Sequence, residues 1–340
     1  RESVFQSNRK FGCTSFDITM ALYSVMGFNK VIKEEVYMEL NQLKTFVTVA
    51  EEQHLTRAAE RLFTSQPAVS AQLKALEESL DVVLFDRTPK GMKLTPSGEK
   101  LLIQAQAALD AANLVVSKAK AMKGEVMGGL SVGVNSDLAF LKIPELLADA
   151  TTAYPGIQLS FINSMSPDIL LDIRKGKLDT GFFFGPSNTA DLHVIKVADI
   201  ETAIVAPVAW KDRVQQASIE ALGAMPWVYT TERCPFYHLT EAMFHEAGVV
   251  PSKTVFVDNE EAIRQLVKSG LGVALLRIDD AEQAEAEGWG TRWEGTPPTI
   301  SLSVAMQTRR TQEPILQAWV DELSKFWAIG DDGRSERQVS

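Results

Sequence analysis

The chain has 340 residues, of which 45% are hydrophobic, and a formal net charge of −10. That length is enough for two or three domains with full cores, and no apolar run approaches the roughly 18 consecutive residues needed to cross a membrane. The acidic balance excludes nucleic-acid binding by bulk positive charge, so any such function depends on where individual basic residues lie.

The stretch Leu55–Glu78 predicts two short amphipathic helices joined by a tight turn, which is the pattern of a helix-turn-helix. Ser65 suits the N-cap of the second helix, and Pro67 falls in its first turn, where a missing N–H costs nothing. One face of that helix is apolar and is predicted to be buried: Val69, Leu73, Leu76 and Leu80. The opposite face is small and polar, so it could approach a DNA duplex closely: Pro67, Ser70, Ala71, Lys74 and Glu78. The pattern alone leaves open an αα-hairpin within a helical core.

The flanking sequence favours the DNA-binding interpretation. An earlier helix is predicted from one apolar stripe, made of Leu40, Leu43, Phe46, Val47 and Ala50. Ala58 and Ala59 are small residues, which suits a close crossing between two helices. After the second helix, residues 80–101 are predicted to form a short strand, a turn at Pro89-Lys90-Gly91 and a return strand, which together make a wing.

Four motifs stand out within residues 38–98: TRAAERL (56–62), SQPAVS (65–70), Leu84-Phe85 with Arg87, and LTPSG (94–98). With these motifs, the segment resembles the N-terminal domain of LysR-type transcriptional regulators. Asp81 departs from the family's usual glycine, and Ala71 stands where many members carry arginine. The resemblance implies double-stranded promoter DNA as a partner, and the positions expected to meet it are Thr56, Arg57, Ser65, Gln66, Pro67, Ser70, Ala71, Lys74, Arg87 and Lys90. Gln66, Pro67 and Ser70 are expected at base edges, because an amide can recognise adenine and a proline ring can touch a thymine methyl group.

The family's domain begins directly after its first methionine, which here corresponds to Met38. We therefore expect residues 1–37 to be translated leader sequence, with a disordered native extension as the alternative. Residues 97–123 are predicted to form one long linker helix, since small and apolar residues recur there with 4–3 spacing: Leu101, Ala105, Ala108, Ala112, Val115, Ala119 and Met122. Packing against the same chain is one explanation of this seam. The resemblance favours pairing with a second subunit, which gives a homodimer or a homotetramer.

From Gly124 onward, strands and helices alternate, which predicts parallel βαβ units. The predicted strands are 130–134, 157–163, 178–184, 202–206, 226–230, 254–257, 273–276 and 300–306. The predicted helices are 138–154, 166–175, 236–247, 260–269 and 313–326. This order, together with the segment GLGVALL (270–276), resembles the family's effector domain of periplasmic-binding-protein type II architecture. The expected boundaries are 38–96 for the winged helix-turn-helix, 124–327 for the effector domain, 128–200 with 303–327 for lobe I, 201–302 for lobe II, and 328–340 for a disordered tail.

In such an architecture the ligand lies beyond the carboxyl ends of the strands, between the lobes. The side chains expected there are Asn135, Ser136, Asp137, Asn163, Ser164, Phe184, Thr230, Cys234, Asp258 and Arg277. Hydroxyl and amide groups near helix starts suit a small carboxylate, and Arg277, which replaces the family's usual proline, would add a bidentate donor. Asp137, Asn163 and Asp258 could instead be ordinary N-caps and Arg277 a surface residue, and the acidic side chains leave the effector's charge open.

No motif of an enzyme or of a nucleotide-binding loop is present, and no catalytic residue, cofactor or metal site is predicted. Cys234, His238 and His245 lack a fourth ligand for a metal. Arg233 and a helix start are expected to lower the pKa of Cys234 and make its thiol reactive. Cys13 and Cys234 are far apart in the sequence, which fits a reducing cytoplasm. The sequence thus predicts a cytoplasmic, effector-responsive DNA-binding regulator that could also contact RNA polymerase. The alternative is a solute-binding or catalytic α/β protein with an accessory DNA-tethering head.

Overall fold

The computed structural model describes residues 38–89, 91–186 and 191–327. These residues fall in two compact units, the first ending at Ala111 and the second beginning at Ala112. Within these ranges, no helix has both the length and the apolar character required to cross a membrane. The predicted leader (1–37), the predicted tail (328–340) and Lys90 lie outside the described residues.

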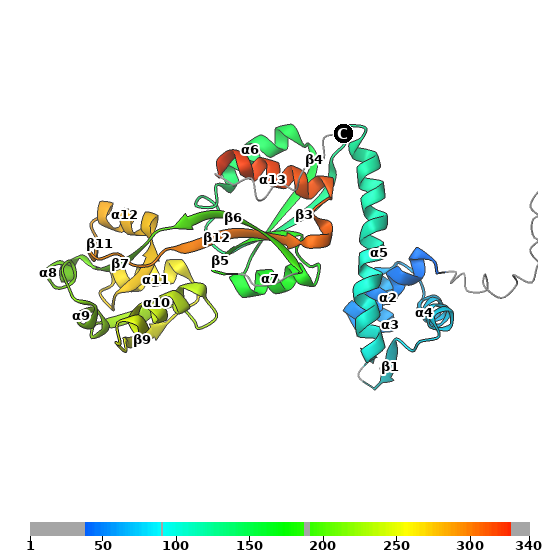
Figure 1. Ribbon diagram of the computed structural model, residues 1–340, viewed down its shortest axis with the longest axis horizontal. Coiled ribbons are helices and arrows are strands. Elements are labelled where there is room, and N and C mark those ends of the chain that lie inside the picture. The colour runs from blue at the N-terminus through cyan, green and yellow to red at the C-terminus, as the bar shows by residue number, and fades with distance from the viewer. Residues whose placement is uncertain (1–37, 90, 187–190, 328–340) are drawn as a thin grey trace, which may run out of the picture. The chain divides into compact units, whose positions relative to one another are not determined.

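The first unit contains a three-helix head (Figure 1). Its helices are α2 (Leu40–Glu52), α3 (Leu55–Arg61) and α4 (Gln66–Leu80). The Ser65 hydroxyl accepts a hydrogen bond from the Ala68 N–H at 3.4 Å, so α4 begins where the N-cap pattern predicts. The core includes most of the predicted apolar positions and one that was not predicted, Val49; its buried members are Leu43, Phe46, Val49, Ala58, Ala59, Val69, Leu73 and Leu76. Leu40, which was expected in the same apolar stripe, is 53% exposed.

A two-stranded wing follows α4. Strand β1 (Phe85–Thr88) pairs antiparallel with β2 (Gly91–Leu94). The Glu77 carboxylate fastens the start of the wing to α4, because it accepts the N–H groups of Leu84 at 2.7 Å and Phe85 at 3.3 Å. Gly91 has φ +127°, and a Cβ there would lie 2.3 Å from the carbonyl oxygen of Gln53, so only glycine fits this close approach.

Helix α5 (Pro96–Ala121) is a single long helix, as the heptad pattern predicts. Its first seam positions pack within the head: Ala105 is buried, and Leu101 and Ala108 lie against the same core. Farther along, Val115 is 70% exposed and Met122 is 88% exposed. The heptad positions before Ala111 therefore pack on the chain's own head, and the later positions Val115 and Met122 are exposed.

In the second unit, lobe I is built on a five-stranded sheet with the order β4-β3-β5-β12-β6. Its strands are β3 (Met127–Val134), β4 (Gly156–Asn163), β5 (Thr180–Phe184), β6 (Leu192–Ile200) and β12 (Ile300–Gln307). Strand β3 runs parallel to β4 and β5, whereas β12 is antiparallel to β5 and β6. The helices α6 (Ile143–Ala153) and α13 (Pro314–Phe326) lie on one face, and α7 (Ser166–Arg174) lies on the other (Figure 1).

Lobe II contains a three-stranded sheet with the order β10-β7-β11 and a parallel pair, β8-β9. A bridge between Trp227 and Val273 joins the two. The strands are β7 (Thr202–Pro207), β8 (Pro226–Tyr229), β9 (Ser252–Phe256), β10 (Ala274–Arg277) and β11 (Gly290–Arg292). The helices are α8 (Lys211–Val214), α9 (Ile219–Gly223), α10 (Pro235–Glu246), α11 (Glu260–Lys268) and α12 (Ile278–Ala286), with 3₁₀ turns at Val208–Trp210 and Thr308–Arg310.

One predicted helix begins later than expected, and several elements were not predicted. Strand β6 was not predicted, and it runs antiparallel to β12, so the lobe I sheet is mixed rather than purely parallel. The helix expected from Leu138 begins at Ile143, because Lys142 adopts a left-handed conformation with φ 56° that no continuous helix permits. Helix α12 was not predicted either, although it directly follows β10 and carries Asp280.

Candidate DNA-binding surface and effector cleft

The start of α4 presents the residues expected at base edges. Gln66 and Pro67 are exposed in its first turn, and Ser70 is partly exposed one turn later. Val69 and Leu73 point into the core with at most 2% exposure, so the opposite face is free for a partner. The element therefore presents a small polar surface at a helix N-terminus, where backbone N–H groups also favour phosphate.

The basic residues around α4 are held by short-range contacts. The guanidinium of Arg87, on the wing, donates to the Ser70 hydroxyl at 3.3 Å, so the wing and α4 meet at this point. The Nη2 of Arg57 donates to the carbonyl oxygen of Glu52 at 2.6 Å, and Lys74 lies 3.5 Å from Glu78. Thr56, Ser65 and Ala71 are exposed beside these residues.

Phe63 is a residue that the sequence did not single out. It lies in the turn between α3 and α4, has φ 52°, and is 97% exposed. In the sequence, Phe63 directly follows the apolar Leu62. The hydrophobic periodicity does not show that Phe63, unlike Leu62, is almost fully exposed.

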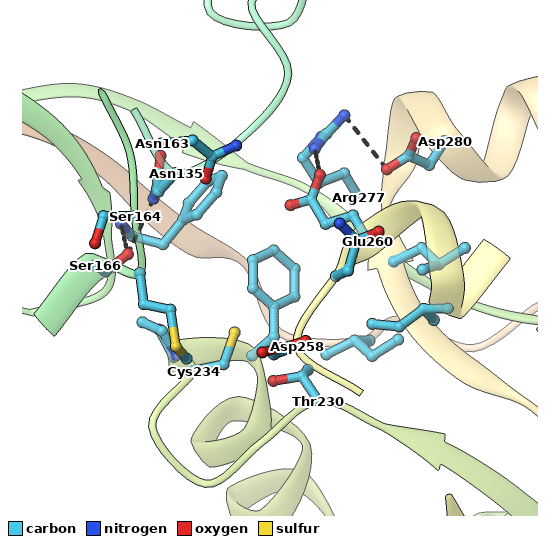
Figure 2. A pocket seen from close by; sticks show the side chains of 18 residues that line it. Asn135, Asn163, Ser164, Ser166, Thr230, Cys234, Asp258, Glu260, Arg277 and Asp280 are labelled. Carbon is cyan, nitrogen blue, oxygen red and sulfur yellow. Dashed lines mark hydrogen bonds and ion pairs between the residues drawn. The ribbon is translucent and has the colours of Figure 1, made fainter. Parts of the chain in front are cut away.

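In the second unit, a cavity of about 320 Å³ lies between the lobes (Figure 2). The lobe I wall is formed by residues at the carboxyl ends of β3, β4 and β5 and at the start of α7. The lobe II wall comes from β8, β10 and the starts of α10, α11 and α12. The lining side chains are Asn135, Asn163, Ser164, Met165, Ser166, Phe184, Thr230, Cys234, Pro235, Phe236, Asp258, Asn259, Glu260, Ile263, Leu275, Leu276, Arg277 and Asp280.

Eight of the ten side chains expected in the cleft line this cavity. Ser136 and Asp137 do not; they lie behind it and hydrogen-bond to Arg277 at 2.5 Å and 2.9 Å. Of the suggested N-caps, Asp137 accepts the Phe140 N–H at 2.7 Å, as an N-cap does, but in the turn before α6. Neither Asn163 nor Asp258 caps a helix, whereas the Asn259 side chain caps α11 by accepting the Ala262 N–H at 3.0 Å. Ser166, Glu260 and Asp280 were not expected in the cleft, because a sequence does not reveal which helix starts face one cavity.

Arg277 of lobe II forms hydrogen bonds to both lobes. Its side chain is 2% exposed, and each of its five N–H groups has an acceptor. On lobe I, Nη1 donates to Ser136 and Nη2 donates to Asp137. The centroid of the Phe140 ring lies 4.0 Å from the guanidinium carbon. On lobe II, the acceptors are Glu260 at 2.8 Å and the Asp279 carboxylate, to which Nε and Nη2 each donate at 3.0 Å.

The carboxylates around Arg277 are crowded. Burial raises the pKa of Glu260 above its usual value, although Arg277 opposes the shift. The pKa of Asp280 is also raised by burial, against the charges of Arg277 and Arg264. Burial by itself lowers the pKa of Arg277, but its hydrogen bond to Asp279 and the neighbouring charges raise that pKa overall, so the guanidinium stays charged.

The expected activation of Cys234 was wrong. Its side chain lies against the cavity, and burial raises the pKa of its thiol above the usual value despite the hydrogen bond from Thr230. The thiol therefore stays protonated at neutral pH, and its thiolate is disfavoured. Across the part of the chain that the structure describes, His, Cys, Asp and Glu side chains form no group of three that could hold a metal ion.

These features define a class of protein: a helix-turn-helix head with a wing, and a separate two-lobed domain with a cavity between its lobes. The sequence patterns of two families match these parts, "Bacterial regulatory helix-turn-helix protein, lysR family" at residues 40–99 and "LysR substrate binding domain" at residues 123–328. The chain belongs to the LysR-type transcriptional regulators. The prediction of the fold and of a DNA-binding, effector-controlled regulator is thereby confirmed, and a catalytic or solute-binding protein with an accessory head is not favoured.

Known relatives agree with this assignment. The uncharacterized HTH-type transcriptional regulator YwqM of Bacillus subtilis is 30% identical over 305 residues, which cover 85% of this chain and 99% of YwqM. The regulator TfdS of Cupriavidus pinatubonensis is 30% identical over 70% of this chain and 82% of its own length. Among solved structures, a full-length OxyR variant from Pseudomonas aeruginosa superposes with a TM-score of 0.67 at 26% identity, covering 84% of this chain and 95% of that chain.

Proposed function

We propose that this chain acts in the cytoplasm as a dimer or higher oligomer, that two copies of α4 bind half-sites of a promoter, and that a small molecule in the cleft controls this binding. The single observation that carries the DNA-binding part is the free first turn of α4. Gln66 and Pro67 are exposed there, while the opposite side of the helix forms the core of the head. The exposed later part of α5, with Val115 and Met122, supports pairing with a second subunit.

Pairing two heads has a physical consequence. A dimer presents two recognition helices to half-sites about one helical turn of DNA apart, so it gains affinity that one head lacks. An effector can control this only if it binds one arrangement of the lobes more tightly than another. Changed spacing of the heads would alter DNA bending and the access of RNA polymerase to the promoter.

The chemistry of the effector follows from the cavity walls. Lobe I contributes Asn163 and Ser164 near the start of α7, which is where a carboxylate group of the effector would find hydrogen-bond donors. The cavity volume of about 320 Å³ suits a small metabolite and lies at the lower end of the range for ligand pockets.

Selection of binding sites from random duplex DNA tests the proposal. The full-length chain should enrich a partly palindromic sequence, and Gln66→Ala should weaken binding to it by about 5- to 150-fold for each half-site, because one bidentate base contact is lost. Gln104→Ala changes an exposed glutamine on α5 in the same way and serves as the matched control. No enriched sequence, or equal binding by both variants, would refute the assignment of α4 as the reading helix.

A further inference from the structure

The charged side chains of the cleft are mostly acidic, and this feature constrains the ligand. Asp258, Glu260 and Asp280 line the cavity, and Arg277 is the only basic residue among the lining side chains. In Figure 2, Glu260, Asp280 and Arg277 lie across the cavity from Asn135 and Asn163, and Asp258 lies beside Thr230. One wall thus carries three carboxylates against one guanidinium.

Arg277 has no donor left for an anion. A guanidinium has five N–H groups, and Ser136, Asp137, Glu260 and Asp279 accept all five. A ligand carboxylate could bind Arg277 only by displacing one of these acceptors, and a displaced carboxylate would then face the ligand's own negative charge. The one arginine in the cavity is therefore a structural group and not an anion receptor.

Acceptor atoms, in contrast, remain free. Asp258, two residues beyond β9, makes no hydrogen bond or ion pair with any other described residue; it is exposed, and it is one of the residues that line the cavity. On the opposite wall, the Nδ2 group of Asn135 donates to the Ser166 hydroxyl at 2.9 Å, whereas its Oδ1 atom is buried without a partner. A buried acceptor without a donor costs free energy, so it marks a place where a ligand donor would be favourable.

The apolar lining of the cavity indicates the chemistry of the uncharged part of the ligand. Phe184, Phe236, Ile263 and Leu275 lie among the lining residues. Such a surface favours a hydrocarbon or aromatic body, which would be held between the acceptors of the two walls.

We propose that the effector carries a cationic ammonium or guanidinium group, bound by Asp258 and Glu260, on a small apolar body that spans the cavity toward the Asn135 oxygen. This inference rests on the proposed function, since it assumes that the cleft is the effector site. It differs from the carboxylate suggested by the lobe I wall alone, although one molecule could carry both groups if it were a zwitterion. Ammonium donors would pair with the carboxylate of Asp258, which has no partner among the described residues.

Compounds with the same body and different charges test the proposal. The melting temperature of the full-length chain is followed by tryptophan fluorescence with 2-phenylethylamine, phenylalanine or phenylacetate, and with butylamine or butyrate. All six tryptophans lie beyond residue 111, so the signal reports the effector domain. We expect the amines or the zwitterion to raise the melting temperature and the two simple carboxylates to leave it unchanged.

Variants locate the binding group. Asp258→Asn should weaken binding of the best cation about tenfold or more by calorimetry, because a charge-assisted hydrogen bond becomes a neutral one. Asp212→Asn makes the same change at an exposed lobe II residue that does not line the cavity, and it should leave the affinity unchanged.

Three results would overturn the inference. One is stabilisation by the carboxylates but not by the amines, which would leave the effector cleft intact and refute only the cationic preference. Another is equal binding by the Asp258→Asn and Asp212→Asn variants. If no compound of either charge binds, the cationic preference is also rejected, and the selection of DNA sites then decides separately whether the regulatory function stands.

Discussion

The buried Arg277 network should dominate the stability of the effector domain. Replacing Arg277 with methionine keeps much of the apolar volume but removes five N–H donors from Ser136, Asp137, Glu260 and Asp279. Breaking a buried ion pair by removing one partner costs about 3–5 kcal/mol, because the remaining charges stay uncompensated. For a domain of this size, each kcal/mol lowers the melting temperature by about 2–4 °C, so we expect a loss of about 6–20 °C.

A second pair between the lobes offers a matched control. Arg233 forms an ion pair with Asp168, but its side chain is 59% exposed, against 2% for Arg277. Exposed pairs contribute about 0–1 kcal/mol, so Arg233→Met should lower the melting temperature by at most a few degrees. Both melting curves are read by tryptophan fluorescence. Equal, small losses for the two variants would refute the claim that burial of Arg277 makes its network strong.

Three further predictions concern other parts of the chain. Asp81→Gly should relieve a left-handed residue with φ 52° and stabilise the head by about 0.5–1 kcal/mol; slower hydrogen exchange of the α4 amides would show this, and faster exchange would contradict it. Arg87→Ala should make the slope of log affinity against log salt less steep by about 0.9 per subunit if Arg87 meets a phosphate, while Arg213→Ala, in the other unit, should leave the slope unchanged. Burial raises the pKa of Glu260 above 4.5, so its ionisation opposes folding, and stability is lost as pH rises through the raised pKa. The melting temperature of Glu260→Gln minus that of the original protein should therefore grow from pH 4.5 to neutral pH, and a difference that shrinks would show that Arg277 overcompensates for the burial.

The head could be predicted from sequence because its signals are local. The apolar positions Val69, Leu73 and Leu76 repeat with the helical period, and Ser65 with Pro67 identifies the first turn of α4. Strand β6 was missed for the opposite reason. It pairs with β12, about 100 residues farther along the chain, and a strand defined by so distant a neighbour has little local signature.

The cleft shows the same division between local and distant information. The rule that ligands lie beyond the carboxyl ends of strands led to Asn135, Asn163 and Asp258, which line the cavity. The rule also led to Arg277, but the role expected of it, donation to an anion, depends on which donors remain free. Those donors are taken in part by Ser136 and Asp137, 141 and 140 positions away in sequence, and no pattern in the sequence reveals such a pairing.

The Arg277 network and the proposed cation site together limit how an effector can act. Separation of the lobes would break the hydrogen bonds from Arg277 to Ser136 and Asp137, which stabilise the arrangement in which both walls face one cavity. A cation bound beside Glu260 would stabilise the ionised carboxylate of that residue, and it would thereby strengthen the hydrogen bond that this carboxylate accepts across the lobes from the Ser136 hydroxyl at 3.2 Å. Such a ligand binds more tightly to the joined lobes than to separated ones. By linkage, it shifts the population toward the joined arrangement by no more than that difference in affinity. A simple anion at the same position would disfavour the ionised form of Glu260 and weaken its hydrogen bond from Ser136, so the sign of the ligand's charge determines the direction of the shift.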